Sequence, residues 1–299
     1  MQQWLKNLLG CPNHPQQGRL FERGRAASHR LVCEQCGTEY PVIDGIVDLT
    51  TEEDRSRFFE SESIQWDTYA AIYDDARAND PPYCASIRMA VGMLRAGPQD
   101  IILDAACGTG LTVRRYFNRG CRVVGLDLSI NSLRYLRKQI SSGQNRLGCV
   151  RANLAKLPLR NRMTSKVICA NALQHLPTAQ LRSTVVRELN RVAHIGGRVV
   201  ISTHNFSEEK KKMGWKKEIE HIGSFSGPVQ YIYRFESEEF KEFLSESMLV
   251  EKVTGVGFSI PCPHKIKHTG VYYALDWTLG QVGRYAPHGH MLLGRCTAK

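Results

Sequence analysis

Two pairs of metal-binding side chains lie near the N-terminus of the chain. Cys11 and His14 form the pair in CPNH, and Cys33 and Cys36 form the pair in LVCEQCG, 18 residues further on. Thiolates and imidazole suit Zn²⁺, and four protein ligands leave no open position on the ion. We therefore predict a structural zinc site; the alternative is three unconnected thiols and a surface histidine.

A second set of candidate residues surrounds the glycine-rich segment DAACGTG, residues 104–110. Its glycines let the backbone approach a ligand closely, and the helix expected after it presents free N–H groups. Asp127 ends the next apolar segment, where a carboxylate can accept hydrogen bonds from both hydroxyls of a ribose. The third glycine of the dinucleotide fingerprint is missing, which argues against a dehydrogenase.

Alternating strand and helix patterns must position these residues. Strands are expected in the apolar segments 101–106, 121–129, 147–154, 166–173 and 197–203, and helical patterns separate several of them. This order predicts an α/β fold with a doubly wound, Rossmann-like parallel sheet. Residues 249–257 and 290–296 are expected to close the sheet as an antiparallel pair. Ligands of such sheets lie beyond the carboxyl ends of the strands.

Composition and charge narrow the class of protein. Of the 299 residues, 42% are hydrophobic, and no window approaches ~18 uninterrupted apolar residues. We expect a soluble, cytoplasmic protein with reduced thiols and no transmembrane segment. Residues 100–203 carry 17 Lys and Arg against 4 Asp and Glu, whereas residues 1–50 are neutral. A positively charged surface of this kind attracts phosphate groups, although the Lys and Arg side chains of such segments usually only face solvent.

From about residue 65 onward the chain resembles the class I S-adenosylmethionine-dependent methyltransferases of the type 11 branch. The resemblance lies in ILDAACGTG, GLDLS, RANLAKLPL, ICANALQHL and LNRVAHIGGRVVIS, in which a Gly-Gly turn precedes the fifth strand. It implies a seven-stranded sheet and S-adenosylmethionine as cofactor. Two departures are Asn153, where an aspartate is usual, and TSK at 164–166 in place of Phe-Asp. The amide oxygen of Asn153 is still expected to accept from adenine.

The resemblance also implies roles for single residues. The amino-acid part of the cofactor would be lined by Asp104, Cys107, Gly108 and Gly110. The nucleoside would be held by Asp127 at the ribose and by Leu128, Asn153 and Leu154 at the adenine, with the Asn171 backbone near the methionine end. Tyr73 would close over the cofactor, or else pack in the core.

The N-terminal segment has a resemblance of its own. The CEQCG pair followed by TEYPVIDGIVDL is similar to the zinc ribbon of tRNA methyltransferase activator subunits and of some ribosomal RNA guanine methyltransferases. His14 replaces the usual fourth cysteine. We expect a zinc ribbon at 1–50, a helical linker or cover at 51–99 and the methyltransferase domain at 100–299. An insertion at about 204–240, with Trp215, Phe225, Tyr231 and Tyr233, is expected to build the acceptor pocket.

Methyl transfer from a sulfonium is an in-line displacement, so a protein base is needed only for a hydroxyl or carbon acceptor. His175 is the best candidate base, with a helix-capping role as the alternative, and His204 is weaker. Three hypotheses follow: an enzyme acting on a small-molecule or lipid-linked acceptor, an RNA methyltransferase, or a non-catalytic zinc-ribbon scaffold. The first is favoured, because the ribbon carries no basic stripe.

Overall fold

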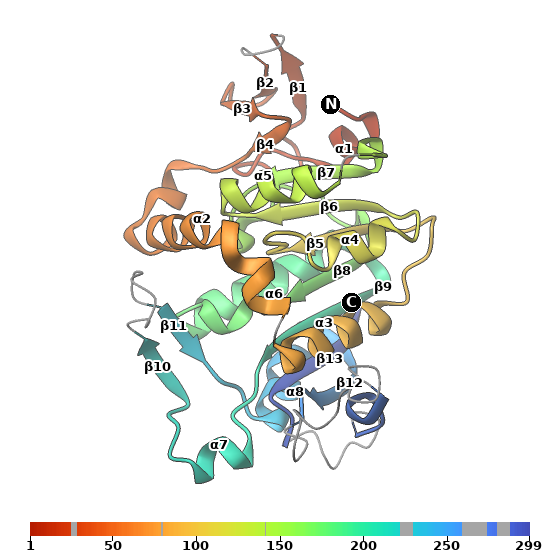
Figure 1. Ribbon diagram of the computed structural model, residues 1–299. Coiled ribbons are helices and arrows are strands. Elements are labelled where there is room, and N and C mark those ends of the chain that lie inside the picture. Colours follow the sequence, from red (N-terminus) through yellow and green to blue (C-terminus); the bar gives the residue numbers. More distant parts are fainter. Residues whose placement is uncertain (25–28, 79, 141, 222–229, 259–273, 280–287) are drawn as a thin grey trace.

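The computed structural model describes residues 1–24, 29–78, 80–140, 142–221, 230–258, 274–279 and 288–299. One large sheet runs through the molecule, with helices packed on both of its faces (Figure 1). It has eleven strands in the order β1-β2-β3-β4-β7-β6-β5-β8-β9-β13-β12. Among the described residues, no helix has an apolar stretch long enough to cross a lipid bilayer.

The middle of the sheet is parallel and carries the candidate cofactor residues. It contains β5 (Ile101–Ala105), β6 (Arg122–Asp127), β7 (Leu147–Arg151), β8 (Thr164–Ala170) and β9 (Ala193–His204). All neighbours among these five strands pair in parallel. The chain builds outward from β5 to β7 and then returns to β8, so the topological switch point lies between β5 and β8.

The closing pair is confirmed and completes the seven strands. β12 (Met248–Val256) pairs antiparallel with β13 (Met291–Ala298), which in turn pairs antiparallel with β9. The Gly-Gly turn is present, although β9 begins before it, at Ala193. The pairing with β8 passes from Thr164 opposite Ala193 to Lys166 opposite Arg198, so residues 194–197 bulge out before regular pairing resumes. Gly196 adopts a φ of +75°, and a Cβ on Gly197 would lie 2.8 Å from the His194 carbonyl oxygen, as in a tight turn.

The N-terminal strands extend the same sheet. β1 (Leu20–Arg23), β2 (Arg30–Cys33) and β3 (Glu39–Ile43) form an antiparallel meander. β4 (Ile46–Asp48) then pairs antiparallel with β3 and parallel with β7. The short helix α1 (Gln3–Leu8) places Leu5 on Gly148 of β7, where a Cβ would lie 2.7 Å from the leucine. The strands before residue 50 and those after it therefore belong to one continuous sheet. The division of the chain into regions at residues 50 and 99 stays a prediction.

Two helices lead from β4 to β5. A 3₁₀ turn, η2 (Glu52–Arg55), leads into α2 (Arg57–Ala78), which lies at the carboxyl ends of the parallel strands, and α3 (Pro81–Leu94) then packs on a face of the sheet against β8, β9 and β13. Pro81 opens α3, whereas the sequence suggested a helix starting near Tyr83. The Asp80 carboxylate caps it by accepting from the Tyr83 N–H at 3.0 Å, and proline suits the first helical position because its missing N–H would be unpaired there.

The other helices connect the strands. They are α4 (Val113–Phe117), α5 (Ile130–Gln139) and α6 (Ala179–Val192). The expected insertion contains α7 (Glu208–Lys212), the two-stranded sheet of β10 (Glu218–His221) and β11 (Gln230–Tyr233), and the start of α8 (Ser237–Ser245). In Figure 1 the β10–β11 pair stands beside the main sheet, below α2. Phe225 lies outside the described residues.

Candidate active site and metal centre

A pocket lies at the carboxyl ends of the parallel strands, next to α2. Its empty volume, counted together with the solvent space at its opening, is about 1080 Å³. The residues that line it include most of the sequence-predicted set: Tyr73, Cys107, Gly108, Asp127, Leu128, Asn153, Leu154, Asn171 and His175. Asp104 and Gly110 are not among the lining residues. Strands β5 to β8 thus bring together positions that are spread over about a hundred residues of chain.

The glycine-rich turn after β5 leaves room for a ligand. Gly108 has a φ of +52°, and a Cβ placed on it would meet no atom within 4 Å, so its backbone faces open space. Gly110, at a φ of +89°, instead packs its α-carbon against the Leu136 side chain of α5. Asp104 is fully buried behind the turn, where Thr112 donates to one carboxylate oxygen. Burial raises the pKa of Asp104 to about 7.

Asp127 is positioned by backbone amides at the end of β6. Its two oxygens accept from the N–H of Ser129 at 2.9 Å and from the N–H of Gly108 at 2.7 Å. Each carboxylate oxygen keeps a further lone pair, which suits the two hydroxyls of a ribose. Burial raises the pKa of Asp127, and these backbone hydrogen bonds oppose the shift. Asn171 also lines the pocket, and its buried side-chain Nδ2 has no partner among the described residues. These features fit an S-adenosylmethionine-sized ligand rich in hydroxyl and amine groups.

Asn153 is engaged differently from the expectation. Its Oδ1 accepts from the N–H of Ala155 at 2.9 Å, and its Nδ2 donates to Asp54 at 2.7 Å. The amide oxygen is therefore already used by the start of the 3₁₀ turn η4 (Leu154–Lys156). Asp54 of η2 therefore places a carboxylate next to Asn153, the residue that stands where an aspartate is usual. The sequence pattern did not reveal this contact, because the two residues are 99 positions apart.

Aromatic side chains from α2 and α3 form one wall of the pocket. The rings of Trp66 and Tyr73 pack edge to face with centroids 6.0 Å apart, and Trp66 packs against His175 at 5.6 Å. The Tyr73 and Tyr83 hydroxyls are 2.9 Å apart. Sequence reasoning identified Tyr73 but missed its neighbours in this wall: Phe58, Phe59, Glu62, Trp66 and Tyr83. The helical spacing of 62, 66, 70 and 73 is a signal that could have found two of them.

His175 lies in the pocket but is a weak base there. Its Nδ1 is 3.2 Å from the Tyr231 carbonyl oxygen, a contact that requires the ring proton on Nδ1. Nε2 then carries the lone pair, which can accept a hydrogen bond from the side-chain nitrogen of Gln174, 3.3 Å away. Burial lowers the pKa of His175 to about 4. Burial also holds the pKa of His204 well below its ordinary value. The catalytic role of His175 stays a prediction.

The four predicted metal ligands meet at one point of the N-terminal segment. The ligand atoms of Cys11, His14, Cys33 and Cys36 all lie within 4.8 Å of one another. Cys11 Sγ is 3.8 Å from Cys36 Sγ and 4.0 Å from His14 Nδ1. Ligands about 2.3 Å from a tetrahedral ion are separated by roughly 3.8 Å, so the spacing fits a metal of the size of zinc.

Local turns create this arrangement. The His14 N–H donates to the Cys11 carbonyl at 3.0 Å, and the Gly37 N–H donates to the Cys33 carbonyl at 2.9 Å, with Gly37 at a φ of +70°. The Thr38 hydroxyl, 3.1 Å from Cys36 Sγ, is the main cause of a pKa lowered to about 6 at that thiol. A thiol that ionises this readily is prepared for metal binding.

The metal centre is joined to the main sheet by backbone hydrogen bonds. The Gly10 N–H donates to the Pro158 carbonyl at 3.0 Å, and the Arg160 N–H donates to the Leu8 carbonyl at 2.9 Å. Both partners belong to the segment that follows Asn153 and Leu154 at the pocket. The N-terminal region is therefore a direct neighbour of the segment that follows the pocket wall.

Comparison with known proteins agrees with this geometry. Residues 103–201 match the family described as "Methyltransferase domain". An uncharacterized chloroplastic methyltransferase of Arabidopsis thaliana is 25% identical over 57% of this chain and 53% of its own length. A malonyl-[acyl-carrier protein] O-methyltransferase of Hamiltonella defensa is 28% identical over 68% of this chain and 81% of its own. The chain thus spans about half the length of the first of these relatives.

Solved structures share the fold. The 1,6-didemethyltoxoflavin-N1-methyltransferase of Burkholderia thailandensis, solved with S-adenosylhomocysteine, superposes with a TM-score of 0.55. The match covers 93% of this chain and 99% of that chain at 14% identity. The likeness shows a shared fold over nearly the whole chain. Within that fold, residues 103–201 form a methyltransferase domain.

Proposed function

We propose that the protein transfers the methyl group of S-adenosylmethionine to a small-molecule or lipid-linked acceptor. The observation that carries this proposal is the character of the pocket. Aromatic and aliphatic side chains dominate its lining, and no lysine or arginine contributes to it among the side chains that the structure describes. A polyanionic acceptor would find no countercharge there, whereas an apolar or uncharged one would be desolvated favourably.

The cofactor would occupy the part of the pocket bounded by β5 and β6. Asp127 would accept from the ribose hydroxyls, Leu128 and Leu154 would contact the adenine, and Gly108 would admit the amino-acid part. When bound, the cofactor supplies an electrophilic methyl group. The aromatic wall would hold the acceptor in line with it and exclude water, and alignment contributes most of the rate in such displacements.

The test is transfer of tritiated methyl from S-adenosylmethionine into an extract of the producing cells from which the gene has been deleted. The extract is then split into RNA, protein, lipid and small-molecule fractions. Label in the lipid or small-molecule fraction, abolished by Asp127→Ala, is the expected result.

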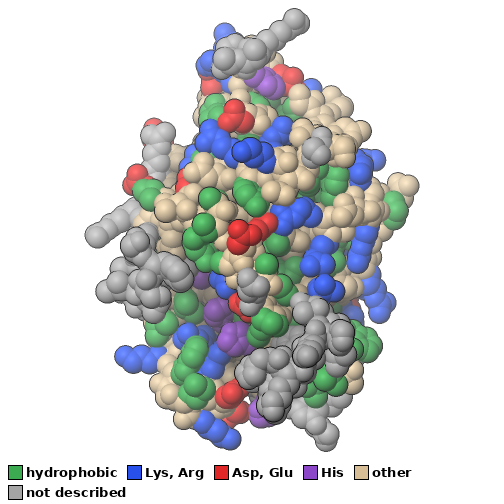
Figure 2. Space-filling model, in the orientation of Figure 1, with side chains coloured by type: hydrophobic (Ala, Val, Ile, Leu, Met, Phe, Trp, Pro, Cys, Tyr) green, Lys and Arg blue, Asp and Glu red, His purple; other side chains and the backbone are tan. Residues whose placement is uncertain are grey.

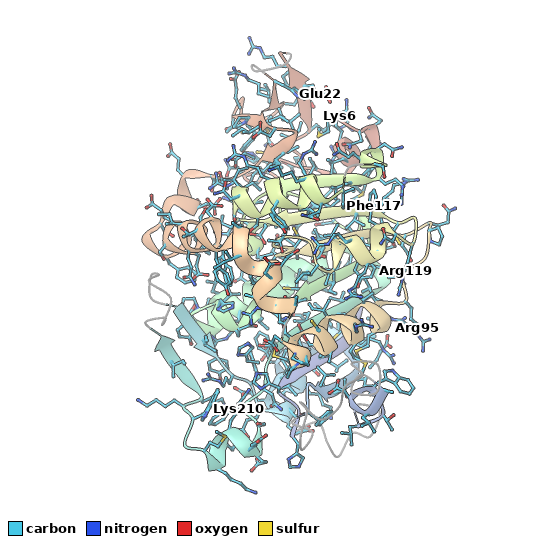
Figure 3. All side chains as sticks on the ribbon, in the orientation of Figure 1. Lys6, Glu22, Arg95, Phe117, Arg119 and Lys210 are labelled. Atoms are coloured by element: carbon cyan, nitrogen blue, oxygen red, sulfur yellow. The ribbon has the colours of Figure 1, made fainter. Side chains whose placement is uncertain are left out.

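RNA is the second candidate acceptor, and the surface charge favours it. Figure 2 shows Lys and Arg side chains gathered along the right side of the view, over α4, with few acidic groups between them. Arg95 and Arg119, which Figure 3 labels on this side, are both exposed. Binding that depended on such a surface would weaken steeply with salt, because phosphate contacts release counterions. Tritiated methyl groups in the RNA fraction would identify RNA as the acceptor.

We also propose that the cluster of Cys11, His14, Cys33 and Cys36 binds one structural Zn²⁺. The donor set and its spacing support this assignment, and a site closed by four protein ligands has no catalytic position. Metal analysis of purified protein should find one equivalent of zinc, lost in Cys33→Ser and kept in Cys84→Ser. Equal zinc content in both variants would contradict the assignment.

A further inference from the structure

A buried carboxylic acid lies in the aromatic wall of the pocket. Glu62 of α2 lines the pocket and is only 8% exposed. One of its oxygens, Oε2, accepts from the Trp66 indole N–H at 3.0 Å, and the Trp66 ring in turn packs against His175. No ion pair joins Glu62 to a described lysine, arginine or histidine. A carboxyl group in such a place is normally protonated or functional.

Several charged groups on the elements around Glu62 are engaged elsewhere. α3, α5 and η2 pack against α2. Arg134 of α5 pairs with Asp44 and Arg137 bonds to Gln144, while Glu53 of η2 pairs with Lys156 and Asp54 accepts from Asn153. Arg151 of β7 reaches the neighbouring Ser63 hydroxyl at 3.3 Å and forms an ion pair with Asp48 at 3.0 Å. Burial raises the pKa of Glu62 to about 7, and the Trp66 hydrogen bond only partly opposes this.

The other titratable groups in the pocket are poorly suited to accept a proton. Both oxygens of Asp127 are held by backbone amides, and the pKa of His175 is lowered to about 4. Burial raises the pKa of the Tyr73 and Tyr83 hydroxyls, which also hydrogen-bond to each other, and of the Cys107 thiol. Glu62, by contrast, ionises near neutral pH, where a general base is most effective.

We infer that Glu62 is the proton acceptor of the reaction, and that the group to be methylated is a hydroxyl or an acidic C–H rather than a carboxylate or a neutral amine. This inference rests on the proposed function. The electron pair of the O–H or C–H bond forms the new bond to the methyl carbon, while the proton passes to the free Oε1 of Glu62. The pair of the broken carbon–sulfur bond stays on sulfur, so charge balances with a neutral carboxylic acid on the protein.

The positions of the neighbours suit this role. Trp66 fixes one carboxylate oxygen and leaves the other for the acceptor. The neutral His175 has its proton on Nδ1, facing the Tyr231 carbonyl, and its Nε2 faces the side-chain nitrogen of Gln174 at 3.3 Å. The imidazole is thus held in place against the Trp66 ring and supports the residue that fixes Glu62. His175 then becomes a positioning residue, and the base is supplied by the helix that covers the pocket.

The test compares Glu62→Gln with Glu60→Gln, which alters an exposed residue of the same helix. Tritiated methyl transfer into the fractionated extract is measured from pH 5.5 to 9. A calorimetric titration with S-adenosylhomocysteine measures cofactor binding, and carboxyl ¹³C NMR of the cofactor-free protein measures the ionisation of Glu62 itself. The wild-type rate should rise with pH through the region near 7. Glu62→Gln should lose about 100-fold or more of the rate together with that rise, while cofactor affinity stays within about threefold.

Transfer that Glu62→Gln retains within about threefold, or an unchanged pH profile, would overturn the inference while leaving the proposed function intact. A loss of cofactor affinity as large as the loss of rate would also overturn it, by showing that Glu62 binds the cofactor. Label appearing on a carboxylate or a neutral amine would contradict the predicted acceptor class. No transfer into any fraction by the wild-type protein would overturn both the inference and the proposed function.

Discussion

Gly18 offers a sharp test of the metal centre, because it touches the cluster without being a ligand. A Cβ at this position would lie 2.7 Å from Cys11 Cβ, 2.9 Å from Cys33 Sγ and 3.0 Å from the His14 carbonyl oxygen. Two of these contacts are shorter than real Cβ atoms adopt, and all three involve metal ligands. Gly18 is not in the left-handed region, so alanine adds a steric clash without a backbone penalty.

The clash should appear mainly as lost metal affinity. With zinc bound the ligands cannot move aside, whereas without zinc the thiols can relax. Overpacking of this kind costs about 1 to 3 kcal/mol, which corresponds to roughly a 5- to 150-fold weaker zinc complex. Competition with a chelator of known affinity measures this in Gly18→Ala. The control is Gly97→Ala, where a Cβ meets nothing within 4 Å. Equal zinc affinity in the two variants would refute both the packing argument and the ligand assignment.

Three further predictions concern the pocket. Asp127→Ala should weaken S-adenosylhomocysteine binding by 2 to 3 kcal/mol or more, on the order of 100-fold by calorimetry, because two charge-assisted hydrogen bonds are lost. Asp54→Ala should lower the free energy of unfolding by about 1 to 3 kcal/mol in urea titrations, because it leaves the buried Asn153 amide unpaired. The ionisation of Glu62 should contribute a loss of stability between about pH 5 and 8, since its raised pKa favours the folded state only while the group is protonated. The lowered pKa of His175 acts in the opposite direction, so this contribution is measured against Glu62→Gln. Glu62→Gln should flatten that loss, and an unchanged pH dependence of unfolding would contradict the burial of this carboxyl.

Local patterns were sufficient for the fold class and for the metal cluster. The cysteine and histidine pairs are brought together by short turns whose geometry follows from their own residues, such as Gly37 at its positive φ. Asp127 and Gly108 could be placed because each follows a buried strand, and the carboxyl ends of neighbouring parallel strands meet at one edge. The Gly-Gly turn could also be placed, but its sequence did not show that β9 begins before it, at Ala193.

The chemistry of the pocket depended on long-range packing. Asp54 reaches Asn153 because β4 adds to β7, which brings the N-terminal segment beside this edge of the pocket. Glu62 lies in the pocket wall, where the next residue, Ser63, donates to the Leu128 carbonyl. The Asp54 contact has no signature in its own stretch of sequence, and the helical spacing of Glu62 indicates only which face of α2 it shares. The sequence by itself thus determined which strands, turns and ligand pairs form, since those depend on near neighbours. Only the tertiary structure decided which acid is buried in the pocket, since burial and the pKa it produces depend on residues from across the chain.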